Sequence, residues 1–168
     1  MNILVTGAAG FIGHAVARAL LARGDSVTGV DNLNDYYSVQ LKRDRLADIG
    51  SAMSFHHLDF ADDKALDTPL AGQKFDAIVH LGAQAGVRYS LENPRAYVQA
   101  NVVGHLNMLE VARASGTPMV YASSSSVYGG NKKMPFAVDD RVDHPMSLYA
   151  ATKKADELMS EKIGRAHV

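Results

Sequence analysis

The 168-residue sequence contains no cysteine, which excludes disulfide bonds and thiolate sites. Its formal net charge of -1 provides no excess positive charge for binding nucleic acid or an acidic membrane surface. No apolar run approaches the ~18 residues of a membrane-spanning helix, and Met1 leads straight into a predicted strand without a basic leader. We therefore expect a cytoplasmic protein that binds neither nucleic acid nor membranes.

The composition also limits the class of protein. Hydrophobic residues make up 47% of the chain and charged residues 21%, as in soluble globular proteins. A chain of this length is expected to form one domain and to bury ~70% of the surface that its unfolded state exposes. The histidines are scattered, and the adjacent pair His56 and His57 lacks a further ligand at helical spacing, so no metal site is predicted.

The opening stretch, MNILVTGAAGFIG, carries the first functional signal. Its apolar run over residues 2–6 predicts a strand, and Gly7, Gly10 and Gly13 follow at a spacing of three. A strand that breaks into a glycine turn and then a helix suits a dinucleotide pyrophosphate, because the backbone can approach the phosphates and the helix N-terminus faces the anion. Glycines at this spacing also occur in plain tight turns.

Asp31 narrows this interpretation. Apolar residues continue with helical spacing to Gly24, and a second predicted strand over 26–30 ends at Asp31. A carboxylate at this place can accept hydrogen bonds from both ribose hydroxyls of an adenosine and would repel a 2′-phosphate. The pattern favours NAD over NADP.

Strands and helices alternate along the whole chain. Strands are predicted at 2–6, 26–30, 53–58, 75–81 and 118–122, and helices at 13–24, 38–49, 61–70, from 94 onward and at 147–161. The predicted buried stripe of the helix that begins at 94 is Val98, Val102, Leu106 and Leu109. The alternation predicts an α/β fold, a doubly wound parallel sheet of Rossmann type with right-handed crossovers.

At three places the residues alone allow more than one interpretation. Asp59 follows the third strand, where it can contact an adenine, cap the helix over 61–70, or do both. Asn101 lies among apolar neighbours and needs a partner, which is either a core group or the cofactor. Ser123 to Ser126 could form a flexible linker, but an ordered strand end with hydroxyls turned into the crevice is favoured.

Tyr149 and Lys153 lie four positions apart, so their side chains share one face of a predicted helix. A phenol with an unperturbed pKa of ~10 is a poor base at neutral pH. A neighbouring ammonium, together with the positive charge of an oxidised nicotinamide, would stabilise the phenolate. Ser124 could hold the reacting oxygen in place. Such a pair alone is usually a surface feature, but downstream of a dinucleotide turn it indicates catalysis.

The sequence resembles the extended short-chain dehydrogenases/reductases of the sugar-nucleotide epimerase and dehydratase group, through GAAGFIG at 7–13, SSSSVYG at 123–129 and YAATK at 149–153. Within that group it most resembles the UDP-glucuronate 4-epimerases, through VDNLNDYYSVQLKRDRL at 30–46, AQAGVRYSLENP at 83–94 and RVDHPMSLYAATKKADELM at 141–159. The likeness extends from residue 2 to about 161. Its one visible departure is Gly82, where the family usually has alanine.

The resemblance implies roles for particular residues. The implied NAD site comprises Gly7, Gly10, Phe11, Ile12 and Gly13 at the pyrophosphate, Asp31 and Asn32 at the ribose, Asp59 and Phe60 at the adenine, Leu81, Ala83 and Gln84 along the cofactor, and Asn101, Ser123, Tyr149 and Lys153 at the nicotinamide half. The implied catalytic residues are Tyr149 as the base, Lys153 as its electrostatic partner and Ser124 as the hydroxyl-positioning residue. Candidate substrate contacts are Arg88, Ser124, Ser125, Ser126 and Tyr149.

The implied reaction is epimerisation of a UDP-sugar at C4, from UDP-glucuronate to UDP-galacturonate, through a transient 4-keto sugar. Related dehydratases and decarboxylases carry an acidic residue just before VYG, where this chain has Ser125 and Ser126, so epimerisation is favoured. The alternatives are a UDP-glucose 4-epimerase, a sugar-nucleotide dehydratase or decarboxylase, and a non-catalytic NAD-binding module. The full-length form is expected to be a homodimer that serves polysaccharide biosynthesis.

Chains of the resembled family are longer. We expect residues 1–162 to form the NAD-binding domain and the last helix to end at about Lys162. Residues 163–168 (IGRAHV) resemble a translated sequencing adapter and are expected to be a non-native tail. The C-terminal substrate domain would then be absent, and the 168-residue form would show little or no turnover.

Overall fold

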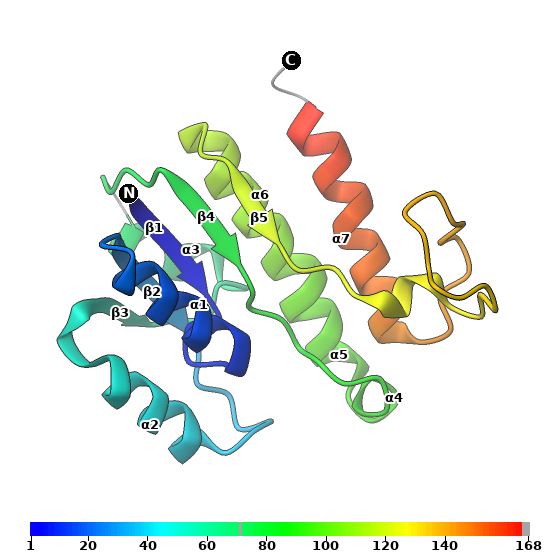
Figure 1. The fold of residues 1–168 in the computed structure, drawn as a ribbon, viewed down its shortest axis with the longest axis horizontal. Helices are drawn as coiled ribbons and strands as arrows, with labels where there is room; N and C mark the ends of the chain where they lie inside the picture. The colour runs from blue at the N-terminus through cyan, green and yellow to red at the C-terminus, as the bar shows by residue number, and fades with distance from the viewer. Residues whose placement is uncertain (71, 166–168) are drawn as a thin grey trace.

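The protein is built around a parallel sheet of five strands, as seen in a computed structural model that describes residues 1–70 and 72–165 (Figure 1). The strands are β1 (Asn2–Thr6), β2 (Ser26–Asp31), β3 (Met53–His57), β4 (Ala77–His80) and β5 (Met119–Tyr121). They lie in the order β3-β2-β1-β4-β5, and each neighbouring pair is parallel. The predicted doubly wound sheet is confirmed.

Helices connect the strands across both faces of the sheet. They are α1 (Phe11–Ala22), α2 (Val39–Ile49), α3 (Asp63–Leu70), α4 (Tyr89–Glu92), α5 (Pro94–Tyr97), α6 (Gly104–Ser115) and α7 (Leu148–Arg165). Shorter helices are η1 (Gly50–Ala52), η3 (Ser125–Tyr128) and the π-helix η2 (Val98–Val103), which joins α5 to α6. Because α7 reaches Arg165, it continues past Lys162, where we expected it to end. Residues 166–168 of the expected tail lie outside the described residues.

Two apolar clusters, one on each face of the sheet, form the core. Ile3 and Val5 belong to the cluster beneath α1 and α2. Leu4, between them, belongs to the opposite cluster, together with Leu66 of α3 and Met108 of α6. Because successive side chains of a strand point to opposite faces, a continuous apolar run suits a strand that is covered on both sides.

The long helix formed by α5, η2 and α6 buries only part of the predicted stripe, because Leu109 is buried as predicted and Val102 is half-buried. Val98 and Leu106 were expected to be buried, but they are 45% and 40% exposed. Tyr97, Asn101 and Met108 are buried instead. The π-helical segment closes each turn with an extra residue, so a regular helical spacing assigns the wrong face on either side of it.

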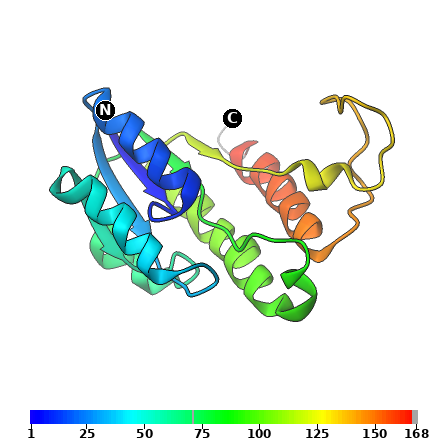
Figure 2. The same cartoon turned by 60° about the horizontal axis from the view of Figure 1, so that its bottom comes forward.

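The last helix, α7, packs against α6 and η2 and also against η3, which follows β5 (Figures 1 and 2). Its first turns therefore lie beside the carboxyl end of the sheet. In the part of the chain that the structure describes, no helix is both long and apolar enough to cross a membrane.

We expect Ile78→Ala in β4 to lower the free energy of unfolding by about 2–5 kcal/mol, because the lost carbons leave a cavity in the core. Ile78 is 0% exposed, whereas Val120 in the neighbouring strand β5 is 68% exposed. Val120→Ala is the matched control and should change stability by less than about 0.5 kcal/mol. Urea unfolding of both variants measures the difference, and equal losses would contradict the assigned core.

Candidate active site

About half of the predicted cofactor residues line one cavity at the carboxyl ends of β1 and β4. The strand order reverses between these two strands, and open parallel sheets bind ligands at such a switch point. A cavity of about 100 Å³ lies there. It is lined by Gly7, Gly10, Asp31, Asn32, Asn34, Tyr36, Tyr37, Lys42, Phe60, Leu81, Gly82, Ala83, Gln84 and Ala100.

Two glycines of the opening turn have no room for a side chain. Gly7 adopts a φ of +68°, and a Cβ there would lie 2.8 Å from the backbone nitrogen of Gly82. A Cβ on Gly13 would lie 2.0 Å from the carbonyl oxygen of Gly7. Gly10 precedes α1 as its N-cap and supplies no side-chain acceptor, so the first N–H groups of α1 are left for an anion.

The hydroxyl of Thr6 joins β1 to β4. Its Oγ1 accepts hydrogen bonds from the backbone N–H groups of Leu81 (3.1 Å) and Gly82 (3.0 Å), and it lies 2.7 Å from Nδ1 of His80. Because the two N–H groups occupy both lone pairs of Oγ1, its proton is donated to Nδ1, and the neutral His80 carries its own proton on Nε2. Burial holds the pKa of His80 well below its usual value, so this imidazole is neutral.

Gly82, the departure from the resembled family, makes room for an aromatic ring. A Cβ at this position would lie 2.4 Å from Cε1 of Phe60. The same ring packs edge-on against His80, with 5.2 Å between centroids. Glycine therefore allows Phe60 to lie directly over the end of β4.

Asp31 is held by protein groups at the other end of the crevice. Its carboxylate accepts hydrogen bonds from the N–H groups of Leu33 (2.8 Å) and Ala9 (3.2 Å). Lys42 Nζ lies 3.6 Å from the same carboxylate, and both side chains are nearly buried. No pattern in the sequence indicated that Lys42 of α2 is buried, and it also donates to Asn34 at 3.0 Å. Lys42 offsets part of the negative charge that we expected Asp31 to present.

Asp59 does not cap α3. It accepts hydrogen bonds from the N–H of Ala61 (2.9 Å) and from the amide of Asn32 (3.1 Å), which orders the turn before the helix. The helix begins only at Asp63, and the carboxylate of Asp62 accepts from N–H groups of its first turn. Asp59 also lines a second hollow of about 220 Å³ beside the first, so its predicted place next to an adenine stays a prediction.

A row of tyrosine rings, which the sequence analysis missed, runs from Tyr36 in the lining of the cavity to Tyr149. The ring centroids lie 4.8 Å apart for Tyr36 and Tyr89, 6.2 Å for Tyr89 and Tyr97, and 6.1 Å for Tyr97 and Tyr149. The hydroxyl of Tyr97 donates to the carbonyl of Ala85 at 2.6 Å. Burial raises the pKa of Tyr97 to about 12, so this phenol stays protonated.

Asn101 holds the loop after β4 to α7. Its Oδ1 accepts from the N–H of Gln84 (2.7 Å), and its Nδ2 donates to the carbonyl of Gln84 (3.1 Å) and to Oγ1 of Thr152 (3.0 Å). Asn101 is 1% exposed. These contacts favour the core hydrogen-bond interpretation of the buried amide.

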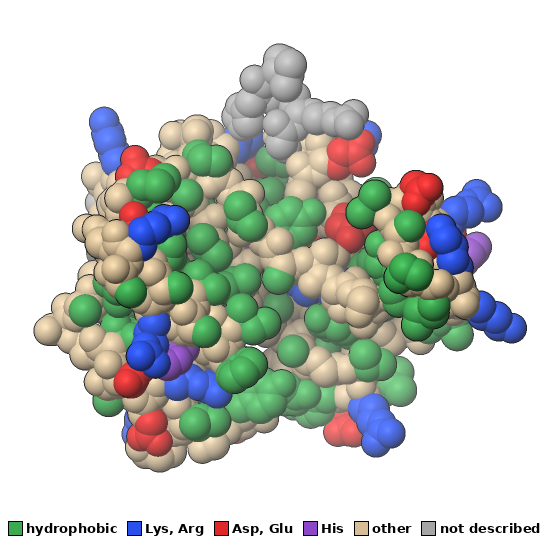
Figure 3. Space-filling view, in the orientation of Figure 1, with side chains coloured by type: hydrophobic (Ala, Val, Ile, Leu, Met, Phe, Trp, Pro, Cys, Tyr) green, Lys and Arg blue, Asp and Glu red, His purple; other side chains and the backbone are tan. Residues whose placement is uncertain are grey.

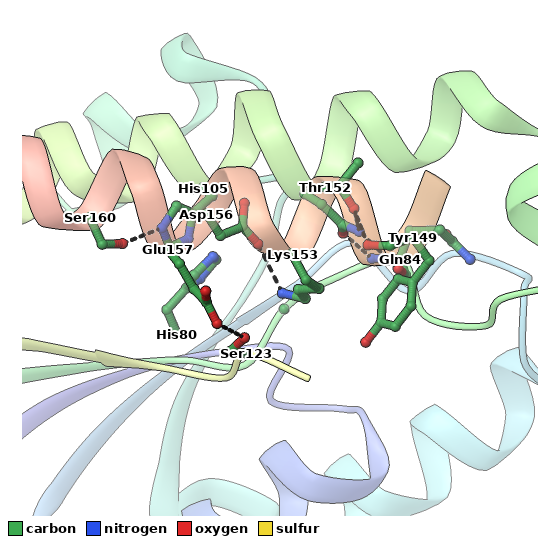
Figure 4. A network of polar contacts seen from close by, with 12 residues as sticks. His80, Gln84, His105, Ser123, Tyr149, Thr152, Lys153, Asp156, Glu157 and Ser160 are labelled. Atoms are coloured by element: carbon green, nitrogen blue, oxygen red, sulfur yellow. Dashed lines mark hydrogen bonds and ion pairs between the residues drawn. The ribbon is translucent and has the colours of Figure 1, made fainter. Parts of the chain in front are cut away.

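Tyr149 and Lys153 lie on one face of α7, and Lys153 lies between Tyr149 and Asp156 (Figure 4). Tyr149 is half-buried, whereas Lys153 is buried and donates from Nζ to Oδ2 of Asp156 at 3.1 Å. Burial raises the pKa of Asp156 to about 6, although Lys153 opposes the rise. At neutral pH this carboxylate is therefore mostly ionised and paired with Lys153.

The serines that follow β5 form an ordered end beside α7 (Figure 4). Ser124 caps η3, because its Oγ accepts from the N–H of Ser126 at 3.2 Å, and its own proton remains available for donation. The hydroxyl of Ser123 donates to Glu157 at 2.6 Å, so it faces α7 rather than the crevice as we expected. Ser125 is exposed.

Several predicted site residues do not line the 100 Å³ cavity at the ends of β1 and β4. Phe11 and Ile12 are 79% and 59% exposed at the start of α1, and Arg88 is exposed just before α4.

On the face shown in Figure 3, charged side chains lie mainly around the margin and uncharged atoms fill the middle. A larger hollow of about 450 Å³ lies at the amino end of β5 and gathers none of the predicted residues. Within residues 1–70 and 72–165, no group of three His, Asp or Glu is placed to hold a metal ion.

The fold and the site together define a Rossmann-type domain with a tyrosine–lysine pair beside its crevice, the arrangement of the sugar-nucleotide epimerase and dehydratase class. The chain belongs to the GDP-mannose 4,6 dehydratase family, whose model matches residues 4–167. The resemblance that the motifs indicated is therefore confirmed.

Individual relatives are similar over nearly the whole chain. It is 50% identical over 170 residues to a probable UDP-glucuronate 4-epimerase from Rhizobium meliloti, covering 99% of this chain and 50% of that protein. A UDP-glucuronic acid 4-epimerase from Bacillus cereus, solved with UDP-glucuronic acid and NAD, has a TM-score of 0.83 at 29% identity over 98% of this chain and 52% of that chain. A UDP-glucose 4-epimerase from Thermus thermophilus, solved with NAD, has a TM-score of 0.85 at 31% identity over 99% and 51%. The chain spans about half the length of the curated relatives it matches.

His105 of α6 is a second buried imidazole beside Lys153 (Figure 4). Its Nε2 lies 2.9 Å from Oγ of Ser160, and its ring centroid lies 5.2 Å from that of His80. Burial, followed by the charge of Lys153, lowers the pKa of His105 to about 4 from 6.5. The native protein therefore keeps His105 neutral at pH values where the unfolded chain protonates it.

This difference predicts a pH dependence of stability. Neutral His105 contributes fully to the free energy of unfolding above pH 6.5. This contribution is lost as the pH falls toward about 4, which lowers the free energy of unfolding by on the order of 3 kcal/mol. Asp156 has the opposite pH dependence, because its pKa is raised in the native protein. Its contribution to the free energy of unfolding is complete below pH 3.8 and is lost as the pH rises through about 6.

We therefore expect His105→Gln to lose less stability than wild type between pH 6.5 and 4, by about 3 kcal/mol in the free energy of unfolding. Urea unfolding across this range measures the difference. His144→Gln, which changes an exposed imidazole, is the control and should follow the wild-type profile. A His105→Gln profile parallel to wild type would show that this imidazole does not titrate as stated.

Proposed function

We propose that the protein containing this chain is an NAD-dependent sugar-nucleotide 4-epimerase that converts UDP-glucuronate to UDP-galacturonate through a transient 4-keto sugar. The observation that carries the proposal is the Tyr149–Lys153 pair, which α7 places beside the ordered serines after β5. The 50% identity to a probable UDP-glucuronate 4-epimerase along the whole chain supports this choice of sugar.

NAD is the cofactor that suits the crevice. The uncapped N–H groups of α1 are suited to a pyrophosphate, and Gly7 and Gly13 keep the backbone free of side chains around it. Asp31 lines the cavity, and its carboxylate is the kind of acceptor that ribose hydroxyls need. Gln84 Nε2 is buried without a hydrogen-bond partner among the described residues and is a further donor for this ligand. When bound, NAD supplies a reversible hydride acceptor.

Residues of this chain would accept the proton of the sugar 4-hydroxyl. Tyr149 takes it from the sugar 4-hydroxyl, Lys153 stabilises the resulting phenolate, and Ser124 donates a hydrogen bond that orients the hydroxyl. Ser125 and Ser126 are neutral where a dehydratase or decarboxylase would need an acid to move protons at C5 or C6. Removal of water or carbon dioxide is therefore not promoted.

A dehydratase is the second candidate, because the matching family model carries that name. It predicts a 4-keto-6-deoxy sugar as the product instead of an epimer. The neutral Ser125 and Ser126 count against it, since elimination requires an acid–base group near C5 and C6.

Cofactor binding can be tested at the opening turn. We expect Gly13→Ala to weaken NAD binding at least about tenfold, because the added methyl collides with the Gly7 carbonyl and displaces the start of α1. Isothermal titration with NAD measures this, and circular dichroism checks the fold. Gly130→Ala is the control, since a Cβ there would lie 3.9 Å from its nearest neighbour, the Met146 sulfur. Unchanged affinity in folded Gly13→Ala would argue against this NAD site.

Turnover should be assayed with the complete coding sequence that contains this chain, using UDP-glucuronate and chromatographic separation of the products. We expect UDP-galacturonate without net reduction of NAD. Tyr149→Phe should lower kcat by about 10²–10⁴-fold, the usual contribution of a positioned acid–base group. Tyr121→Phe, which removes a phenolic hydroxyl in β5 beside the larger hollow and away from the proposed NAD cavity, is the matched control. A pentose or 4-keto-6-deoxy product would favour a decarboxylase or dehydratase, and no turnover of any sugar nucleotide would favour a binding module.

A further inference from the structure

Asp156 is a buried acid to which the proposed reaction gives no role. It is 0% exposed and follows Lys153 by three residues on α7. Its Oδ2 accepts from Lys153 Nζ at 3.1 Å, while its Oδ1 has no hydrogen-bond partner among the described residues. Burying an ionised carboxylate with an unmatched oxygen is costly, and a neutral side chain of similar size would cost less. The charge therefore points to a role other than stability.

The groups around Asp156 leave it as the counter-charge of Lys153. His105 from α6 and His80 from β4 both face this region, and burial keeps both imidazoles neutral by lowering their pKa values. Glu157 on α7 hydrogen-bonds to other side chains. Among the hydrogen bonds and ion pairs of the described residues, Lys153 pairs with Asp156 alone.

We propose that Asp156 is a positioning residue for the Tyr149–Lys153 pair. Its carboxylate holds the Lys153 ammonium in place and offsets part of the ammonium's charge. Figure 4 shows the ammonium between the carboxylate on one side and Tyr149 on the other. The role of the pair in catalysis rests on the proposed function, but the electrostatic coupling does not.

The coupling has a definite sign. A carboxylate beside the ammonium weakens the positive field that stabilises a phenolate at Tyr149. Because the pKa of Asp156 is about 6, the carboxylate is ionised across the alkaline range in which a phenol is titrated. Asp156→Asn keeps an oxygen that can accept from Lys153 and removes the charge. Because the charge of Lys153 is then no longer offset, Tyr149 should become a stronger acid by about tenfold, the order of magnitude that one neighbouring charge gives.

Ultraviolet titration of tyrosinate in the 168-residue chain measures this without NAD or sugar. Wild type and Asp156→Asn are each titrated with and without Tyr149→Phe, so that the difference isolates Tyr149. Glu157→Gln is the matched control, because it neutralises the adjacent carboxylate that does not contact Lys153. We expect a tenfold rise in the acid dissociation constant of Tyr149 in Asp156→Asn and less than a twofold rise in the control. No rise, or an equal rise in the control, would overturn the proposal.

A second comparison separates action through Lys153 from a direct charge effect. In a Lys153→Met background, Asp156→Asn should leave the titration of Tyr149 unchanged, and an undiminished shift would overturn the positioning role. If Asp156→Asn does not fold, NMR titration of the Asp156 carboxyl in wild type and in Lys153→Met measures the same coupling. The acid dissociation constant of Asp156 should fall at least tenfold when Lys153 is removed, and an unchanged constant would overturn the proposal. A protein that failed to epimerise sugars would leave these outcomes unaffected.

Discussion

The backbone N–H groups that leave β4 donate to the hydroxyl of Thr6, the last residue of β1, and this junction sets the geometry of the crevice. The two backbone segments approach so closely there that Gly7 has no room for a methyl group, and the Phe60 ring leaves none at Gly82. Phe60 covers one side of the junction, and His80 hydrogen-bonds to its other side. The start of α1 and the loop after β4 are placed by the same contact, so both walls of the crevice depend on it.

Buried charge is handled in the same way at the two ends of the site. Lys42 lies 3.6 Å from Asp31, the last residue of β2, and Lys153 lies 3.1 Å from Asp156 on α7. Each pair is nearly or fully buried, where a single charge would be far more costly than a paired one. Each acid also limits how much positive potential its lysine presents to the crevice. The local charge therefore follows from pairs rather than from single residues.

Patterns confined to neighbouring residues predicted much of the fold. Alternating and continuous apolar runs located the five strands, and the glycine spacing located the turn, because both reflect backbone constraints that act within a few residues. The same reasoning failed where hydrogen bonding departed from a regular helix, as at Val98 in the π-helix. It also failed for Lys42, because a charged residue in a polar helix carries no local sign of burial.

The sequence by itself determined the order of strands and helices, the glycine cradle and the spacing of Tyr149 and Lys153 on one helix face, since each depends on local geometry. Only the tertiary structure decided which groups meet across the sheet. It paired Asp31 with Lys42, directed Ser123 toward Glu157, and aligned tyrosines from separate segments beside Tyr149. These contacts join residues far apart in the chain, and the packing of α2 and α6 against the sheet and of α7 against α6 selects them.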